Sequence, residues 1–411
     1  MTDSDETTPA PTRLTSLDAY RGFVMFLMMA EVLRLNAVAK AHPDSNVWKF
    51  LAHHQEHVAW AGCTLHDMIQ PSFSFLVGVA LPFSIASRRA RGESTLRMSA
   101  HAFWRGAILV LLGIFLRSVG KPTTNVTFED TLSQIGLGYP ILFLMGLRPT
   151  RDQWIAFGTI VVGYWLAFAL YSPRPDFDYT KVGVPNDWPE LAHGFAAHWN
   201  KNANMASAFD ARFLSLFRSS SSIPFNGGGY VTLSFIPTLG TMILGLIAGG
   251  VLRSERNDWA KVGWFLVAGL IGLASGWVLG YLGICPVVKR IWTPSWVLYS
   301  GGWCFLMLAA WFAAVDLIGP RFLAFPLVVI GMNSIAAYVL AHLIESFIIS
   351  SFKIHGWLVL EPVSAGLKSW FHVDLAESAS GYEPLMQGGC VLFVLWLILL
   401  WMERRRLFLR V

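Results

Sequence analysis

"LHDMIQPSFSFLVGVALPFSIASRRARGESTLR", residues 65–97, joins a long apolar run to a cluster of arginines. The apolar part, 65–87, is long enough to cross a hydrocarbon layer of about 30 Å as a helix. The arginines of 88–97 favour the cytoplasmic end of such a helix. This stretch therefore predicts a membrane-spanning helix and its orientation.

The composition of the whole chain agrees with this interpretation. Of 411 residues, 54% are hydrophobic, 14% are charged and 18 are tryptophans, a balance that excludes an ordinary soluble domain. The net charge of +5 does not indicate a nucleic-acid partner, because the basic residues lie between apolar runs. Composition therefore predicts a polytopic membrane protein.

Further apolar runs of similar length recur along the chain. In lipid the backbone must satisfy its own hydrogen bonds, and these runs lack the alternation of barrel strands, so we expect helices. The prediction is an all-α bundle of about ten transmembrane helices. The runs are 19–38, 65–87, 102–119, 132–147, 154–171, 230–252, 262–284, 295–316, 325–350 and 385–402.

Basic residues between the runs predict a cytoplasmic location for both termini. Residues 1–18 then form a cytoplasmic segment, 19–402 the transmembrane domain and 403–411 a basic cytoplasmic tail. The N-terminus lacks the features of a removable signal peptide. Residues 205–219 suit a short helix that lies in the interface, lids a cavity or packs on the bundle. The expected outer loops are 39–64, 172–229 and 351–384.

Metal and haem sites are disfavoured by the spacing of the cysteines and histidines. Of four cysteines, only Cys63 and Cys285 lie on one side of the membrane where they could pair. His53 and His57 have i, i+4 spacing, but the order H-H-x-E-H lacks a recognisable further zinc ligand. A bis-histidine haem would need two buried histidines, and only His342 is placed suitably.

Ionisable residues within the apolar runs are costly and require a partner, a water-filled cavity or a function. His342 and Glu345 share a helical face, which favours a structural hydrogen-bonded pair over a catalytic one. Arg21, three residues after Asp18, suits a phosphate clamp at the inner mouth of the bundle. The other polar residues of this kind are Glu31, Arg34, Arg105, Arg117 and Asn333.

The stretch "HHQEHVAWAGCTLHD", residues 53–67, gathers histidines and acids at the outer mouth. An imidazole is a common base near neutral pH, and a carboxylate can orient it. His57 has candidate carboxylates in Glu56 and Asp67. Composition alone still favours a solvated interfacial histidine. The remaining histidines, which we expect to be bystanders, are His53, His54 and His66.

Five blocks of the chain form a recognisable series. They are "RLTSLDAYRGFVMFLMM" (13–29), "HVAWAGCTLHDMIQPSFSFLVGVALPFS" (57–84), "GYVTLSFIPTLGTMILGLIAGGVL" (229–252), "CPVVKRIWTPSWVLYSGGW" (285–303) and "PLVVIGMNSIAAYVL" (326–340). In this order they resemble the heparan-α-glucosaminide N-acetyltransferase family in its shorter bacterial form.

The resemblance implies a reaction, a location and partners. Family members transfer an acetyl group from cytoplasmic acetyl-CoA to an amino sugar on the far side of the membrane, without a metal. The chain would thus be a multi-pass enzyme of a bacterial cytoplasmic membrane, with acetyl-CoA, a saccharide acceptor and the bilayer as partners. N-acetylation is favoured over O-acetylation, and a homodimer would fit the family.

Residue roles also follow from the resemblance. The pattern H-A-x-W-x-G-x-T-x-x-D implies His57 as catalytic base, or as a transient acetyl carrier, and Asp67 as the carboxylate that orients it. Contacts with acetyl-CoA are implied at Arg21 and Gln134. Departures from the family pattern around Glu31 and Gln134 leave the acceptor open. Substrate contacts are implied at Trp60, Glu31, Lys289, Trp292 and Asn333.

Two other functions stay open at this point. A secondary transporter or flippase for a sugar or lipid-linked saccharide would use the polar groups for permeation, without acyl chemistry. A structural membrane subunit would not need the side chains of His57 and Asp67. Transfer of labelled acetyl groups distinguishes the enzyme from both.

Overall fold

The protein is described by a computed structural model that covers residues 14–172, 177–217, 225–319, 321–355 and 381–409. Within these ranges every regular element is a helix, and extended backbone forms one isolated bridge, between Ala61 and Val288. The predicted all-α fold is therefore confirmed. The segments and loops that lie partly outside the described residues are 1–18, 172–229, 351–384 and 403–411.

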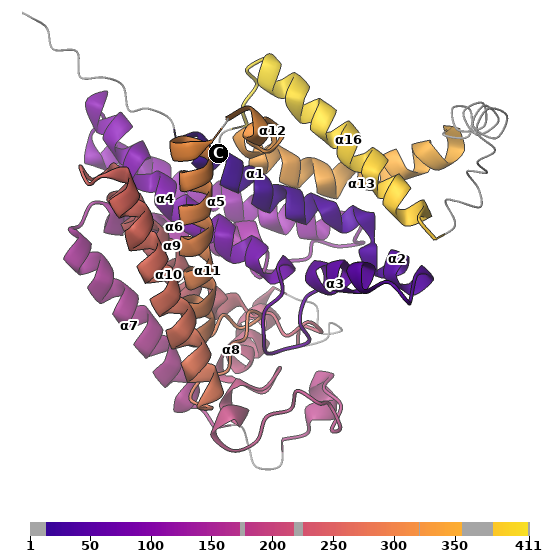
Figure 1. The fold of residues 1–411 in the computed structure, drawn as a ribbon. Coiled ribbons are helices and arrows are strands. Elements are labelled where there is room, and N and C mark those ends of the chain that lie inside the picture. Colours follow the sequence, from indigo (N-terminus) through magenta and orange to yellow (C-terminus); the bar gives the residue numbers. More distant parts are fainter. Residues whose placement is uncertain (1–13, 173–176, 218–224, 320, 356–380, 410–411) are drawn as a thin grey trace, which may run out of the picture.

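The predicted apolar runs lie largely within the helices of the bundle (Figure 1). Shorter helices lie in the connections: α2 (Leu35–Ala41), α3 (Asn46–Gln55) and α8 (Met205–Phe213). The longer elements are α1 (Thr15–Met29), α4 (Ile69–Ala90), α5 (Thr95–Ser118), α6 (Thr131–Gly146), α7 (Thr150–Ala169), α9 (Phe235–Arg253), α10 (Asp258–Tyr281), α11 (Pro294–Trp311), α12 (Phe325–Met332), α13 (Ser334–His355) and α16 (Glu383–Arg404).

Length and composition suit several of these helices to a bilayer. Seven of those described are long and apolar enough to cross a membrane, and the bent pair Thr15–Leu33 and Leu35–Ala41 raises the number to eight. Helix α6 is apolar but shorter. The chain is thus an integral multi-pass membrane protein, while the number of about ten spans stays a prediction.

Two runs predicted as single helices are broken in the structure. The run 19–38 bends by 46° next to Arg34, whose φ of 48° and ψ of 49° are left-handed. The run 325–350 is divided into α12 and α13 at Asn333, where φ is −125° and ψ is 38°. Apolar periodicity reports which residues are buried and carries no signal for one non-helical residue. The single-helix prediction was therefore wrong at both positions.

Helices α4 and α9 cross with their backbones in close contact. A Cβ atom on Gly78 would lie 1.9 Å from the carbonyl oxygen of Met242, and one on Gly245 would lie 1.9 Å from that of Phe75. Such an approach requires glycine on both helices, as at other membrane helix interfaces. The crossing fixes α4, which begins beside Asp67.

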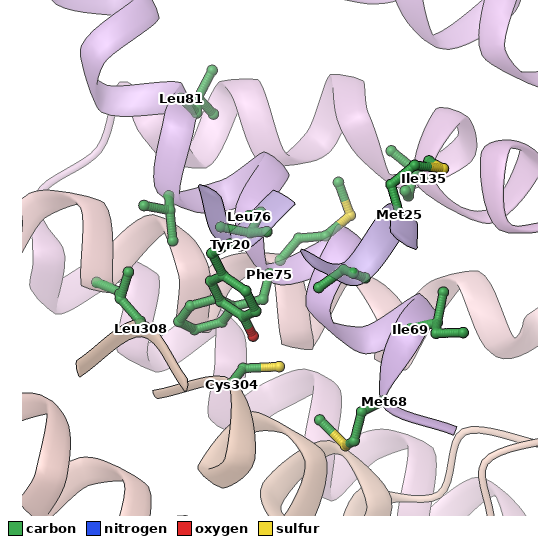
Figure 2. Packing of buried hydrophobic residues seen from close by; sticks show 14 of the residues in the cluster. Tyr20, Met25, Met68, Ile69, Phe75, Leu76, Leu81, Ile135, Cys304 and Leu308 are labelled. Carbon is green, nitrogen blue, oxygen red and sulfur yellow. The ribbon is translucent and has the colours of Figure 1, made fainter. Parts of the chain in front are cut away.

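A buried core joins α1, α4 and α11. Figure 2 shows Tyr20 packed close to Phe75 and Cys304. The Tyr20 hydroxyl donates to Ser72 Oγ at 3.1 Å, so this buried polar group is satisfied within the core. The contact holds α1 against α4, and each of these helices leads to polar residues at the same end of the bundle.

The short helix predicted within 205–219 is present as α8 and a following turn, Leu214–Leu216. The Phe213 ring lies 5.8 Å from that of Phe128, and the Asp210 carboxylate accepts a hydrogen bond from the Thr232 backbone N–H at 2.8 Å. Among the described residues α8 therefore packs on the bundle, as one of the predicted alternatives had it.

Candidate active site

Three loops meet beside the start of α4 and are tied together by backbone groups. The Gly62 N–H donates to the Val287 carbonyl at 2.9 Å. The guanidinium of Arg290 donates to the carbonyls of Gly228, at 2.6 Å, and Val58, at 3.1 Å. The loops before α4, α9 and α11 therefore hold one another in place.

His57 and Asp67 face each other within this assembly. Asp67 lies in a 3-10 turn before α4, and its Oδ1 is 2.8 Å from His57 Nδ1. Its Oδ2 accepts hydrogen bonds from the backbone N–H groups of Thr64, at 3.1 Å, and Val58, at 3.3 Å. Only 1% of the Asp67 side chain is exposed, against 35% of His57. The carboxylate is therefore fixed, whereas the ring reaches accessible space.

Lys289 completes the cluster from the loop before α11. Its Nζ lies 3.3 Å from Asp67 Oδ1 and 3.3 Å from His57 Nδ1. Burial lowers the pKa of Lys289, and the Asp67 carboxylate opposes that shift. The three residues form a His–Asp–Lys group in which one buried carboxylate contacts both neighbours.

The protonation of His57 follows from this environment. Burial lowers the pKa of the imidazole below its ordinary value; the bond to Asp67 opposes this effect, and the charge of Lys289 adds to it. The ring is therefore neutral near pH 7, with Nδ1–H donating to the carboxylate. In the described part of the chain its hydrogen bonds use Nδ1, so Nε2 carries the lone pair that can accept a proton.

His57 and Lys289 line a cavity of about 690 Å³, a size that suits small-molecule substrates. One part of its wall is polar and carries charged side chains from several helices. The other part is apolar and comes from α1 and the turn after it, and from α4, α13 and α16. The apolar part includes Met28, Met29, Val32, Phe73, Ala341 and Leu395.

A second ion pair lies on the polar wall. Arg117, at the end of α5, approaches Asp130 with an Nε to Oδ2 distance of 3.2 Å. The same carboxylate oxygen accepts a hydrogen bond from the Tyr338 hydroxyl at 3.0 Å. Asp130 also caps α6 through the Leu132 N–H, so this pair links α5, α6 and α13 across the cavity.

His66 belongs to the cavity, although the sequence suggested a bystander. It is buried, its Nε2 lies 3.0 Å from Glu31 Oε1, and its ring centroid is 4.5 Å from that of His57. Glu31 itself is 58% exposed and also lines the cavity. The 3-10 turn at 66–68 places two consecutive residues, His66 and Asp67, around His57, which sequence spacing did not reveal.

The two predicted tryptophan contacts lie away from the cavity. Trp60 is 3% exposed, and its indole N–H donates to the carbonyl of Trp199 at 3.2 Å. Trp292 is 1% exposed and donates to Thr241 Oγ1 at 3.1 Å. Both rings are core residues in this structure, so their positions do not support stacking on a substrate.

The residues predicted to contact acetyl-CoA, Arg21 and Gln134, do not lie beside His57, and neither does Asn333, which was predicted to contact the substrate. Arg21 pairs with Asp18 at 3.2 Å near the start of α1. Gln134 is buried and donates to the carbonyls of Phe128 and Thr232. Asn333 is buried at the break before α13, where its Oδ1 accepts a hydrogen bond from the Leu409 N–H. Their roles toward a substrate stay predictions.

The predicted bond between His342 and Glu345 is absent from the described contacts. His342 Nδ1 instead lies 2.8 Å from the carbonyl oxygen of Tyr338, one turn earlier on α13. Both side chains line the cavity. Cys63 and Cys285 are free thiols. Within the described ranges no group of three or more His, Cys, Asp or Glu side chains is arranged to hold a metal ion.

The fold and this cluster define a class: a helical, multi-pass membrane protein with a neutral, carboxylate-oriented histidine at a large cavity. The histidine has the surroundings of a general base. No protein-family profile matches the chain.

Two curated proteins are similar to it. The human heparan-alpha-glucosaminide N-acetyltransferase is 24% identical over 378 residues, which cover 82% of this chain and 54% of the human protein. The mouse protein of the same name is 23% identical over 371 residues, with the same two shares. The resemblance inferred from the sequence is thus confirmed by these two relatives. The chain spans about half the length of these relatives.

Proposed function

We propose that this protein is a membrane acetyltransferase that moves an acetyl group from cytoplasmic acetyl-CoA to the amine of a saccharide on the outer side of a bacterial cytoplasmic membrane. The observation that carries the proposal is the contact of His57 Nδ1 with the buried Asp67 carboxylate, beside a cavity. The similarity to two N-acetyltransferases supports the same reaction class.

The chemistry requires a base more than an activated electrophile, because a thioester is already reactive. The acceptor amine attacks the thioester carbonyl, a C–N bond forms and the C–S bond breaks. His57 Nε2 takes the amine proton and returns it to the departing thiolate. Asp67 holds the ring by its Nδ1–H and stabilises the imidazolium while it exists.

Topology adds a direction to this proposal. With ten spans and cytoplasmic termini, the loop that carries His57 lies on the outer side, where an extracytoplasmic saccharide would arrive. The donor would then approach from the inner side of the bundle. Direct transfer requires donor and acceptor to meet in the cavity; otherwise His57 Nε2 would carry the acetyl group between them.

Purified protein with labelled acetyl-CoA and a panel of amino sugars tests the reaction. We expect labelled N-acetyl sugar, and we expect His57→Ala to lower the rate at least about 100-fold. Asp67→Asn should lower kcat with little change in KM, because the amide cannot hold the same tautomer. His54→Ala, in the same region but outside the cluster, is the matched control.

The proposal would be contradicted by unchanged acetyl transfer in His57→Ala, or by a protein that neither binds nor consumes acetyl-CoA. Release of CoA in a single turnover without acceptor, with one acetyl group left on the protein, would identify the histidine-carrier route.

A further inference from the structure

The positive side chains on the cavity wall are matched by buried carboxylates. Lys289 Nζ lies 3.3 Å from Asp67, and Arg117 Nε lies 3.2 Å from Asp130. Each aspartate is 1% exposed. Ion pairs this close present little net charge to a ligand, so these two cations do not make the cavity attractive to an anion.

Three glutamates line the same cavity, and one of them, Glu129, accepts a hydrogen bond from the side-chain amide of Asn226 at 2.6 Å. Glu31 approaches from the turn after α1, and Glu345 from α13. In the described part of the chain neither has a lysine or arginine within 4.0 Å. Glu31 contacts a ring nitrogen of His66 at 3.0 Å, and Arg34, which is not part of the cavity wall, acts on Glu345 only at longer range.

Glu31 is also close to the reacting centre. Its carboxylate touches His66, whose ring lies 4.5 Å from that of His57, and it is 58% exposed. With a cationic group bound to Glu31, only the His66 ring would therefore separate the ligand from His57. A sulfate or carboxylate group in the same position would meet a like charge at close range.

We infer that the acceptor is a small cationic amino saccharide without sulfate or carboxylate groups, and that Glu31 and Glu345 select it. This inference rests on the proposed function and narrows its substrate class. The carboxylates concentrate the ammonium form of the acceptor. Its neutral conjugate, formed by loss of one proton to solvent, is the form that attacks.

The test compares glucosamine with glucosamine 6-sulfate as acceptors for the purified full chain. We expect kcat/KM for the sulfated sugar to be at least about tenfold lower, since like charges brought together in a binding site are strongly disfavoured. Added salt should narrow the difference, because it screens the exposed Glu31.

Two variants assign the effect to the carboxylates. Glu31→Gln and Glu345→Gln should raise KM for glucosamine and reduce the difference in kcat/KM between the two sugars. In both variants kcat should fall less than in His57→Ala. Glu255→Gln is the control, because Glu255 is exposed on the loop between α9 and α10. In Glu255→Gln the ratio of kcat/KM for the two sugars should equal that of the unaltered protein.

Equal use of the two sugars by the unaltered protein would overturn the inference, and so would an unchanged preference in both glutamine variants. If the protein transfers no acetyl group to any acceptor, the proposed function fails separately. Equilibrium binding of glucosamine and its 6-sulfate, measured by calorimetry, then tests the selection by itself: tighter binding of glucosamine supports it, and equal or tighter binding of the sulfate refutes it.

Discussion

At the scale of single residues, the buried ammonium of Lys289 has two opposing effects on the proposed base. It compensates the Asp67 carboxylate, and it stands 3.3 Å from His57 Nδ1. Because burial and this charge both lower the pKa of His57, the imidazole stays neutral at a pH where a solvent-exposed histidine begins to gain a proton. We therefore expect Lys289 to act on the base through its charge.

Lys289→Met should move the acidic limb of the pH–rate profile to higher pH, by about one unit. The sign follows from the charge: without the ammonium, the pKa of His57 rises, so the base becomes protonated at a higher pH and activity is lost earlier as the pH falls. The measurement is kcat/KM for acetyl transfer between pH 5 and 9.

Lys201→Met provides the control for this profile, because Lys201 is not part of the cavity wall or the cluster. If the acidic limb of the pH–rate profile does not move in a folded, monodisperse Lys289→Met variant, the lysine does not control the pKa of His57.

Residue chemistry explains which parts of the site could be predicted. His57 and Asp67 were identified by resemblance, and Glu31 and Lys289 also line or join the cavity. His66 was missed because its role depends on a 3-10 turn that turns it toward His57. Trp60 and Trp292 were expected at the substrate and are core residues, since a tryptophan in a sequence does not reveal which side of a loop it faces.

At the scale of helices, the close approach of α4 and α9 depends on glycine. The site depends on it too, because the 3-10 turn that carries Asp67 leads directly into α4 and the turn that carries Thr232 leads directly into α9. A side chain at the crossing would push the two helices apart, and the loops at their ends would follow.

Gly78→Ala should therefore lower the apparent Tm in detergent by about 5 °C or more, since its methyl group would lie 1.9 Å from a carbonyl oxygen of α9. Gly250→Ala is the matched control on α9, where a Cβ meets nothing within 4 Å. Alanine favours a helix over glycine, so this variant should keep or raise the Tm. A similar change in both variants would exclude the crossing as the cause.

The helices themselves were predictable because lipid leaves an apolar chain few alternatives. Their interruptions were not. Arg34 and Asn333 leave the helical conformation at positions where the surrounding apolar pattern continues. The break at Arg34 follows the turn that carries Glu31, so the unpredicted irregularity lies next to a proposed specificity residue.

At the scale of the whole molecule, the proposed orientation can be tested with single cysteines in a chain whose native cysteines are replaced. Glu255→Cys should react with a membrane-impermeant maleimide only from the cytoplasmic side, and Asp187→Cys only from the outer side. Both positions are exposed. Labelling of both from one side would contradict the topology inferred from the basic loops.

The ties around Arg290 have a mechanical consequence. The wall that carries His57, Lys289 and Gly228 consists of three loops bound to one another through backbone carbonyls. The facing wall, α13, joins α6 through one tyrosine hydroxyl on Asp130. The loop wall is therefore fixed by several bonds around the base itself. The base is therefore expected to keep its position when substrates enter and leave the cavity.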